Sequence, residues 1–242
     1  MSYFQRWIAV WISAAMFIGL AENCTGDDAP AAGDASAKLP PHPKAIPGSA
    51  ELDNKIRRIG FAFVSFEDAN HRNHRFPARA IFDNQGKPLL SWRVRILPFI
   101  GEKELFRQFH LDEPWDSEDN KALIAKMPDI YLRPGRPNNG KTTFLVPVGK
   151  GLAFDGTEGL TIGSFDEVRM TIMMVDANDD RAVIWTKPDD LEVDTEKPKN
   201  GLGDALEGGF TVLFGDGHID FLRKKIKATT LNSLFKVRRP TN

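Results

Sequence analysis

The sequence predicts an α+β protein in which one long N-terminal helix packs on a mostly antiparallel sheet. Apolar residues recur at helical spacing early in the folded body, and short β-branched or aromatic runs dominate from Thr142 onward. The segment before the helix has the composition of a leader followed by an unstructured tether. Because helices and strands are segregated along the chain, the α+β class is favoured over α/β.

Composition limits the function classes. The chain has 242 residues, a formal net charge of −1, 27% charged residues, 41% hydrophobic residues and one cysteine. A near-neutral chain is not a general nucleic-acid binder, because binding phosphates requires an excess of Lys and Arg. A single cysteine excludes an internal disulfide and a metal site built from several cysteines.

Residues 1–21 predict a secretory leader or an uncleaved signal-anchor. Residues 7–21 are almost entirely apolar, they follow Arg6, and small residues precede the polar sequence beyond them. As a helix they would span about 22 Å, less than the roughly 30 Å hydrocarbon core of a bilayer. Cys24 offers an alternative, lipidation as in bacterial lipoproteins. Each alternative implies export.

Residues 22–50 predict a disordered tether. Ala, Pro and Gly make up 15 of the 26 residues from Thr25 to Ala50, and Pro40–Pro43 favours an extended chain. The remaining residues, 51–242, are enough for a single α+β domain with its own core. A leader, a tether and a folded domain in this order are typical of a protein held at a membrane surface.

The first element expected in the folded body is a helix from about Ala50 to Ala69. Glu51 and Asp53 in its first turn suit the positive end of the helix dipole. Its apolar residues are spaced by four, three, four and three positions, so they form one stripe that faces a core. These residues are Leu52, Ile56, Ile59, Phe63 and Phe66.

Shorter elements are expected after this helix. An apolar stretch opens at Ser91–Trp92 and ends at Pro98. Two short helices are expected at Glu102–Phe109 and Ser117–Met127, the second stopped by a proline.

Five short strands are expected in the second half of the chain, and the last two form a hairpin. Asp216-Gly217 between those two strands favours a tight turn with a positive φ angle. The expected strands are Thr143–Val146, Met170–Val175, Ala182–Trp185, Phe210–Phe214 and His218–Leu222.

Several long motifs resemble the domain-of-unknown-function-1559 family. They lie at residues 56–100, 109–128, 140–151 and 180–191, and the last is GGFTVLFGDGHIDFL at residues 208–222. The resemblance implies a pseudopilin-like fold, a long N-terminal helix on an antiparallel sheet. It implies no established biochemical role, although a label used for the family hints at solute binding. It also implies structural roles for the motif residues Trp92, Pro98, Asp216 and Gly217.

Three motifs match ligand-binding patterns weakly. Residues 135–142 fit the G-x-x-x-x-G-K-S/T pattern of nucleotide-binding loops, but a β-like run follows them instead of a helix. His71 and His74 offer two metal ligands and lack a third, which favours ordinary surface histidines. Residues 176–180 resemble the start of a calcium loop, but Arg181 stands where glycine is required. We interpret that segment as a polar hairpin turn.

The C-terminal segment Arg223–Arg239 contains seven basic residues and no acidic one. It is either a solvated face or a patch that contacts anionic lipid headgroups or a wall polymer.

These observations favour a non-enzymatic, exported protein of the cell envelope. We expect a membrane tether through the leader or a lipid on Cys24, and a role in surface structure, secretion-associated assembly or recognition of an envelope protein or glycan. Self-association would involve Phe63 or Phe66. We expect no cofactor, no bound metal and no nucleic-acid partner.

Two other functions remain open. The chain is alternatively an extracytoplasmic binding module for a small solute or glycan, with Trp92, Trp115 and Trp185 as stacking faces or, more simply, as core anchors. The third hypothesis is a nucleotide-binding protein that uses residues 135–142.

Overall fold

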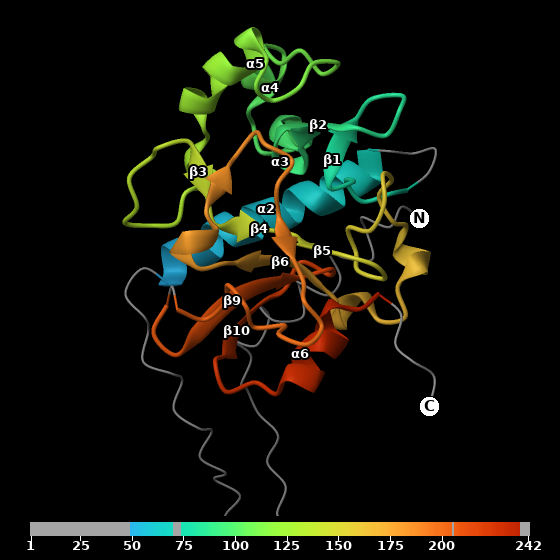
Figure 1. Cartoon of the computed structure of the whole chain (residues 1–242), viewed down its shortest axis with the longest axis vertical. Coiled ribbons are helices and arrows are strands. Elements are labelled where there is room, and N and C mark those ends of the chain that lie inside the picture. Colours follow the sequence, from blue (N-terminus) through green and yellow to red (C-terminus); the bar gives the residue numbers. More distant parts are fainter. Residues whose placement is uncertain (1–48, 70–73, 205, 238–242) are drawn as a thin grey trace, which may run out of the picture. The chain divides into compact units, whose positions relative to one another are not determined.

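The computed structural model describes residues 49–69, 74–204 and 206–237 (Figure 1). All of them belong to one compact unit, Ile46–Asn242. The expected leader, residues 22–48 of the expected tether, Cys24 and His71 lie outside the described residues, whereas residues 49 and 50 belong to the first helix. Of the helices that the structure describes, none combines the length and the apolarity needed to span a bilayer.

Helix α2 (Ser49–Ala69) confirms the element expected from the apolar stripe. Leu52, Ile56, Ile59 and Phe63 are all buried in the main core. A Cβ atom added to Gly60 would lie 2.9 Å from a methyl group of Leu213, so glycine allows the helix to approach the sheet closely.

Phe63 and Phe66, which were expected to contribute to self-association, differ in their exposure. Phe63 is buried and packs edge-on against Trp92, with ring centroids 5.1 Å apart. Phe66 is half-buried and packs against Phe99 at 5.6 Å. Because Phe63 serves the core, it is not an exposed contact in the folded protein. Self-association itself stays a prediction.

A four-stranded antiparallel sheet packs against α2, which confirms the α+β class. The strand order is β10-β9-β6-β4, and every neighbouring pair is antiparallel. Figure 1 shows α2 and α6 on opposite faces of this sheet. The elements are β4 (Phe144–Leu145), β6 (Ile172–Asp176), β9 (Gly209–Phe214), β10 (Ile219–Arg223) and α6 (Ala228–Phe235).

The two faces of the sheet follow the alternation of side chains along its strands. In β9, Leu213 joins the core beneath α2, whereas Val212 and Phe214 join a second cluster with Leu231 and Phe235 of α6. Helix α6, which the sequence analysis missed, lies in the middle of the basic segment Arg223–Arg239 and is anchored by apolar residues. A contact of this segment with anionic lipid or wall polymer stays a prediction.

Strand β6 departs from the alternation at one point. Met173 and Met174 both face the core of α2, while Ile172 and Val175 face α6. The pairing of β6 with β9 shifts register between Ile172 and Met174. The irregularity adds a residue to one strand, which explains why two consecutive side chains share a face.

The hairpin between β9 and β10 has the turn that the sequence predicts. Gly217 has a φ angle of 84°, in the left-handed region that favours glycine. The Asp216 carboxylate accepts a hydrogen bond from the His218 backbone at 3.1 Å and lies 3.3 Å from the Arg169 guanidinium. The His218 ring stacks on Phe214, with centroids 4.3 Å apart.

Smaller elements connect α2 to the sheet and flank its edge. A hairpin of β1 (Ala80–Phe82) and β2 (Pro88–Ser91), which the sequence analysis missed, precedes α3 (Trp92–Arg95). The two helices expected next are present but shorter. The remaining elements are η1 (Leu97–Phe99), α4 (Lys103–Phe106), α5 (Glu118–Ala122), η2 (Leu123–Lys126), η3 (Asp129–Tyr131), β3 (Lys141–Thr142), β5 (Pro147–Val148), η4 (Ile162–Ser164), η5 (Val168–Met170), η6 (Asp179–Arg181), β7 (Val183–Ile184) and β8 (Leu191–Glu192).

The expected hairpin around residues 176–180 is wrong. Strand β6 pairs with β4 and β9, whereas β7 pairs with β3 in a separate two-stranded sheet. The segment therefore connects two sheets instead of turning one strand back on its neighbour. Its side chains are held by arginines, as described below.

Candidate ligand cavity and histidine cluster

A buried ion pair fixes the position of helix α3. Arg93 is fully buried, and its guanidinium donates to Asp190 at 2.7 Å and to the carbonyl of Phe144 at 2.7 Å. Trp92, also fully buried, donates from its ring nitrogen to the same carboxylate at 3.2 Å. Burial raises the pKa of Asp190, and the Arg93 charge opposes this rise. Arg93 is thus buried with hydrogen-bond partners that the chain supplies, and Trp92 is a core anchor.

A cavity of about 390 Å³ opens beside the exposed end of α3. Its lining combines apolar side chains with a larger share of polar surface, and its charged residues are two arginines and one glutamate. The lining residues are Phe66, Arg75, Phe76, Ala78, Ala80, Ile81, Phe82, Arg95, Thr157, Glu158 and Gly159.

Arg95 is the cation of this cavity that lacks a counter-ion. Its guanidinium carbon lies 5.8 Å from the centroid of the Phe66 ring. Although the side chain is exposed, the surrounding chain removes enough water from the guanidinium to lower its pKa from the ordinary value. In the described part of the chain, no carboxylate forms an ion pair with Arg95. An arginine stays charged under such conditions, so the cavity holds an uncompensated positive charge.

Arg75 also lines this cavity and is already paired. It lies 3.2 Å from a carboxylate oxygen of Glu158 and donates to the carbonyl of Gly159 at 2.8 Å. A Cβ atom at Gly159 would lie 1.7 Å from the carbonyl oxygen of Phe76, so only glycine fits at this close approach. With Glu158 neutralised by Arg75, the net charge of the lining is that of Arg95.

A second cavity of similar size, about 380 Å³, differs in its charges. Arg79 and Lys150 face Asp155 and Glu192 around it, so basic and acidic residues are equal in number. It therefore carries no charge preference that would select a ligand.

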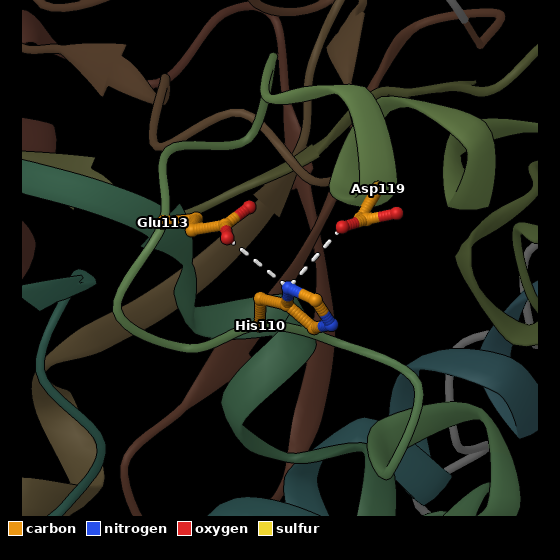
Figure 2. Close-up of side chains that lie close together, drawn as sticks. All are labelled: His110, Glu113 and Asp119. Carbon is orange, nitrogen blue, oxygen red and sulfur yellow. Dashed lines mark hydrogen bonds and ion pairs between the residues drawn. The ribbon is translucent and has the colours of Figure 1, made fainter.

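A cluster of one histidine and two carboxylates lies on the surface between α4 and α5 (Figure 2). The Nδ1 atom of His110 is 3.1 Å from Glu113 Oε1 and 3.3 Å from Asp119 Oδ2. The hydrogen bond and charge of Glu113 raise the pKa of His110, and the same hydrogen bond lowers the pKa of Glu113. The sequence analysis missed this cluster.

Asn120 holds the backbone of the cluster in place. Its buried side-chain amide accepts from the His110 backbone nitrogen at 3.0 Å and donates to the His110 carbonyl at 2.9 Å. The same nitrogen donates to the carbonyls of Glu113 and Pro114 at 3.2 Å and 3.1 Å. The loop that carries His110 and Glu113 is thereby fixed against the helix that carries Asp119.

Residues 53–167 match the family model described as "Protein of unknown function (DUF1559)". Over these residues the chain belongs to the DUF1559 family. The matched segment includes the Arg95 cavity and the His110 cluster but ends before Asp176 and the β9–β10 hairpin. The likeness of residues 180–191 and 208–222 to the family stays a prediction.

The short name of this DUF1559 model, SBP_bac_10, hints at an extracytoplasmic protein. No curated protein and no solved structure matches the chain.

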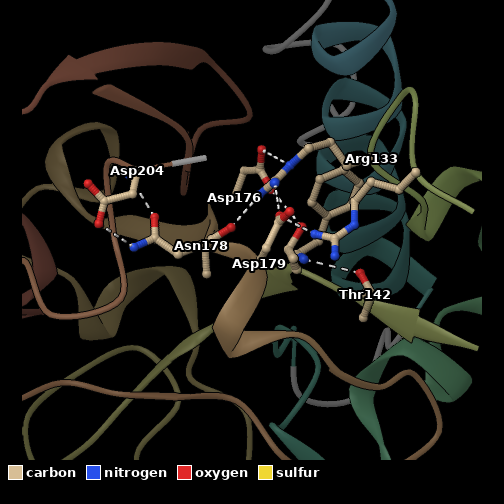
Figure 3. A network of polar contacts seen from close by, with 10 residues as sticks. Arg133, Thr142, Asp176, Asn178, Asp179 and Asp204 are labelled. Carbon is tan, nitrogen blue, oxygen red and sulfur yellow. Dashed lines mark hydrogen bonds and ion pairs between the residues drawn. The ribbon is translucent and has the colours of Figure 1, made fainter. Parts of the chain in front are cut away.

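The contacts of residues 176–180 do not support the calcium-loop hypothesis. Figure 3 shows Arg133 between Asp176 and Asp179. Arg133 donates to both carboxylate oxygens of buried Asp176, at 2.8 Å and 2.6 Å, and also pairs with Asp179, which Arg136 contacts as well. Burial raises the pKa of Asp176, and Arg133 opposes this rise. The carboxylates of this segment therefore stabilise the fold.

The backbone that follows residues 135–140 contradicts the nucleotide-loop hypothesis. Residues after Gly140 form strand β3 instead of a helix. The backbone nitrogens of Gly140 and Lys141 donate to the side chains of Asn138 and Asn139, each at 3.2 Å. Because a phosphate site needs free amides at a helix N-terminus, this loop does not provide one.

Two of the three tryptophans are core anchors, which is the simpler of the two alternatives that the sequence left open. Trp92 and Trp185 are fully buried, and Trp185 donates to the carbonyl of Ile124 at 2.9 Å. Trp115 is half-buried. His74 lies 3.6 Å from Glu67, and no third ligand joins this pair among the residues that the structure describes.

Proposed function

We propose that this chain is an exported, membrane-tethered, non-enzymatic envelope protein whose folded domain binds a small extracytoplasmic solute with a carboxylate group. The observation that carries the proposal is the unpaired Arg95 guanidinium in a cavity of about 390 Å³. The leader-like residues 1–21, the tether composition of residues 22–50 and the DUF1559 match support export.

The size and lining of the cavity suit a small molecule. Ligand sites typically enclose about 300–1,000 Å³ and combine an apolar lining with a few polar groups that fix orientation. Phe66, Phe76, Ile81 and Phe82 supply the apolar surface here. A ligand with an aromatic or branched aliphatic body would pack against them.

The charge of the cavity selects the polar group of the ligand. A guanidinium presents two parallel N–H donors that match the two oxygens of a carboxylate. The attraction is stronger where water is reduced, as it is around Arg95. The carboxylate would take the place of the counter-ion that the protein does not supply to Arg95.

Calorimetric titration of the full-length protein tests the proposal. The panel contains aromatic and branched-chain carboxylates, including free amino acids, and the amides of the same molecules as neutral controls. We expect one carboxylate site, with the amides at least about tenfold weaker because the charged hydrogen bonds are lost.

Two arginine variants locate the site. Arg95→Gln should weaken carboxylate binding at least about tenfold, whereas Arg107→Gln, at an exposed arginine outside the cavity, should leave it unchanged. Equal binding by wild type and Arg95→Gln would contradict the site. A panel without any bound carboxylate would contradict small-solute binding and favour recognition of an envelope protein or glycan.

A further inference from the structure

We propose that His110, Glu113 and Asp119 bind one divalent transition-metal ion of the zinc type. This site is separate from the Arg95 cavity and does not rest on the proposed solute binding. Each of the three residues offers one ligand atom, and these atoms lie within 4.8 Å of one another.

The distances within the cluster suit a shared metal ion. In a tetrahedral site with metal–ligand distances of about 2.0–2.1 Å, neighbouring ligand atoms are about 3.3 Å apart. His110 Nδ1 lies 3.1 Å and 3.3 Å from the oxygens of Glu113 and Asp119. Two edges of the tetrahedron are therefore already in place, and the third requires only rotation of exposed carboxylates.

The charge of the cluster also favours a cation. Residues 110–119 contain five acidic residues and no lysine or arginine. Within the described ranges, the only cationic partner of the Glu113 and Asp119 carboxylates is the imidazole of His110. A divalent ion bound to neutral imidazole would cancel both carboxylate charges.

The loop does not need to reorganise to bind the ion. Asn120 ties the backbone of His110 to that of Glu113 and is itself the neighbour of Asp119 on α5. The three ligand side chains are 50%, 40% and 63% exposed, so an ion reaches them directly from solvent. Their exposure also leaves the fourth coordination position to water or to a side chain of a partner.

The set of donor atoms selects the type of metal. One imidazole nitrogen and two carboxylate oxygens are ligands that zinc and cobalt accept in tetrahedral sites. Calcium instead takes six to eight oxygen ligands, of which the cluster supplies too few.

The test is titration of the full-length, metal-free protein with Zn²⁺ by calorimetry and with Co²⁺ by visible absorption, which reports tetrahedral coordination. We expect one ion bound per chain, and its binding should require the three residues. Zinc should also raise Tm, because the ion binds only the folded loop. His110→Ala should abolish this ion. Glu113→Gln and Asp119→Asn should each weaken it at least about tenfold.

Matched controls separate this site from other ligands of the chain. His74→Ala removes an exposed histidine that faces a single carboxylate, and Glu118→Gln removes a neighbouring acidic residue; both should bind zinc as wild type does. Absence of zinc and cobalt binding would overturn the proposal. So would binding and a Tm rise that persist in His110→Ala, or calcium binding in place of zinc.

Discussion

Arg93 and Arg95 are two residues apart on the four-residue helix α3, and their surroundings are opposite. Arg93 is fully buried, and a carboxylate, a backbone carbonyl and the hydroxyl of Ser91 accept its hydrogen bonds. Arg95 is exposed beside the ring of Phe66 at the cavity, without a carboxylate partner among the described residues. The burial of one arginine thus fixes the helix from which the other projects.

The difference between Arg93 and Arg95 shows when a charged side chain stabilises the fold and when it stays available to a ligand. A buried charge whose partners are all supplied by the chain has no capacity left for a ligand, and its loss leaves those partners unsatisfied. A charge without a partner adds little to stability and keeps its capacity. We therefore expect the two arginines to differ in which property their substitution changes.

The largest effect is expected for Arg93→Met. The substitution leaves the buried Asp190 carboxylate without its cation, which typically costs about 3–5 kcal/mol of unfolding free energy. Urea unfolding followed by circular dichroism measures the loss. The double variant Arg93→Met with Asp190→Leu should recover most of it, and a loss under about 1 kcal/mol in the single variant would contradict the structural role.

The stability deficit of Arg93→Met should also depend on pH. Burial raises the pKa of Asp190 in the folded protein, and removal of Arg93 takes away the charge that opposes this rise. A carboxyl group with a raised folded-state pKa stabilises the fold while protonated, and this contribution is lost as pH rises through that pKa. The deficit should therefore be smaller at pH 4 than at pH 8, as judged by paired urea titrations.

A smaller loss of unfolding free energy is expected for Arg133→Met. Like Arg93, Arg133 pairs with a buried carboxylate, but its second carboxylate partner is exposed. Asp179 is 63% exposed and regains water, and Thr143 still donates to Asp176 at 2.8 Å. We expect a loss of about 2–3 kcal/mol in the same unfolding experiment. A loss as large as that of Arg93→Met would show that exposure does not separate the two networks.

Gly217→Ala provides a reference change that removes no polar partner. Alanine at a φ angle of 84° costs about 1–2 kcal/mol because its Cβ atom meets the neighbouring carbonyl oxygen. Gly163→Ala, at a glycine with no such angle, should change stability by less than about 0.5 kcal/mol. Similar values for the two glycines would contradict the turn geometry.

The smallest effect on stability is expected for Arg95→Gln. Because the chain provides no ion-pair partner for Arg95 in its described part, we expect a change within about 0.5 kcal/mol. Thermal unfolding without ligand measures it, alongside the binding loss expected above. A loss of stability comparable to that of Arg133→Met would instead show that Arg95 stabilises the fold.

The elements that depend on local pattern could be predicted from the sequence. The apolar spacing of α2 predicts its start to within one residue, and alternation with Asp216-Gly217 predicts the β9–β10 hairpin. Strands β1 and β2 have only three and four residues, too few to show a period. Helix α6 starts at Ala228 without a capping side chain and contains two consecutive threonines, so its helical pattern is weak.

The candidate sites depend on contacts between distant residues and could not be predicted. The lining of the cavity combines Phe66, six residues between positions 75 and 82, Arg95 and residues 157–159. Asp190 pairs with Arg93 across 97 positions of sequence. The cluster in residues 110–119 could have been predicted from the sequence, since five acidic residues and one histidine without a basic residue form a local pattern.

The packing of α2 against the β9–β10 hairpin has a consequence for the order of folding. Helix α2 opens the described chain, whereas β9 and β10, which it contacts, are the last two strands of the sheet. The apolar stripe of α2 thus leaves the ribosome, or an export channel, long before the strands that cover it. Contacts between such distant segments slow folding, because a long loop must close before they form. We expect the domain to complete its core only after β10 has emerged.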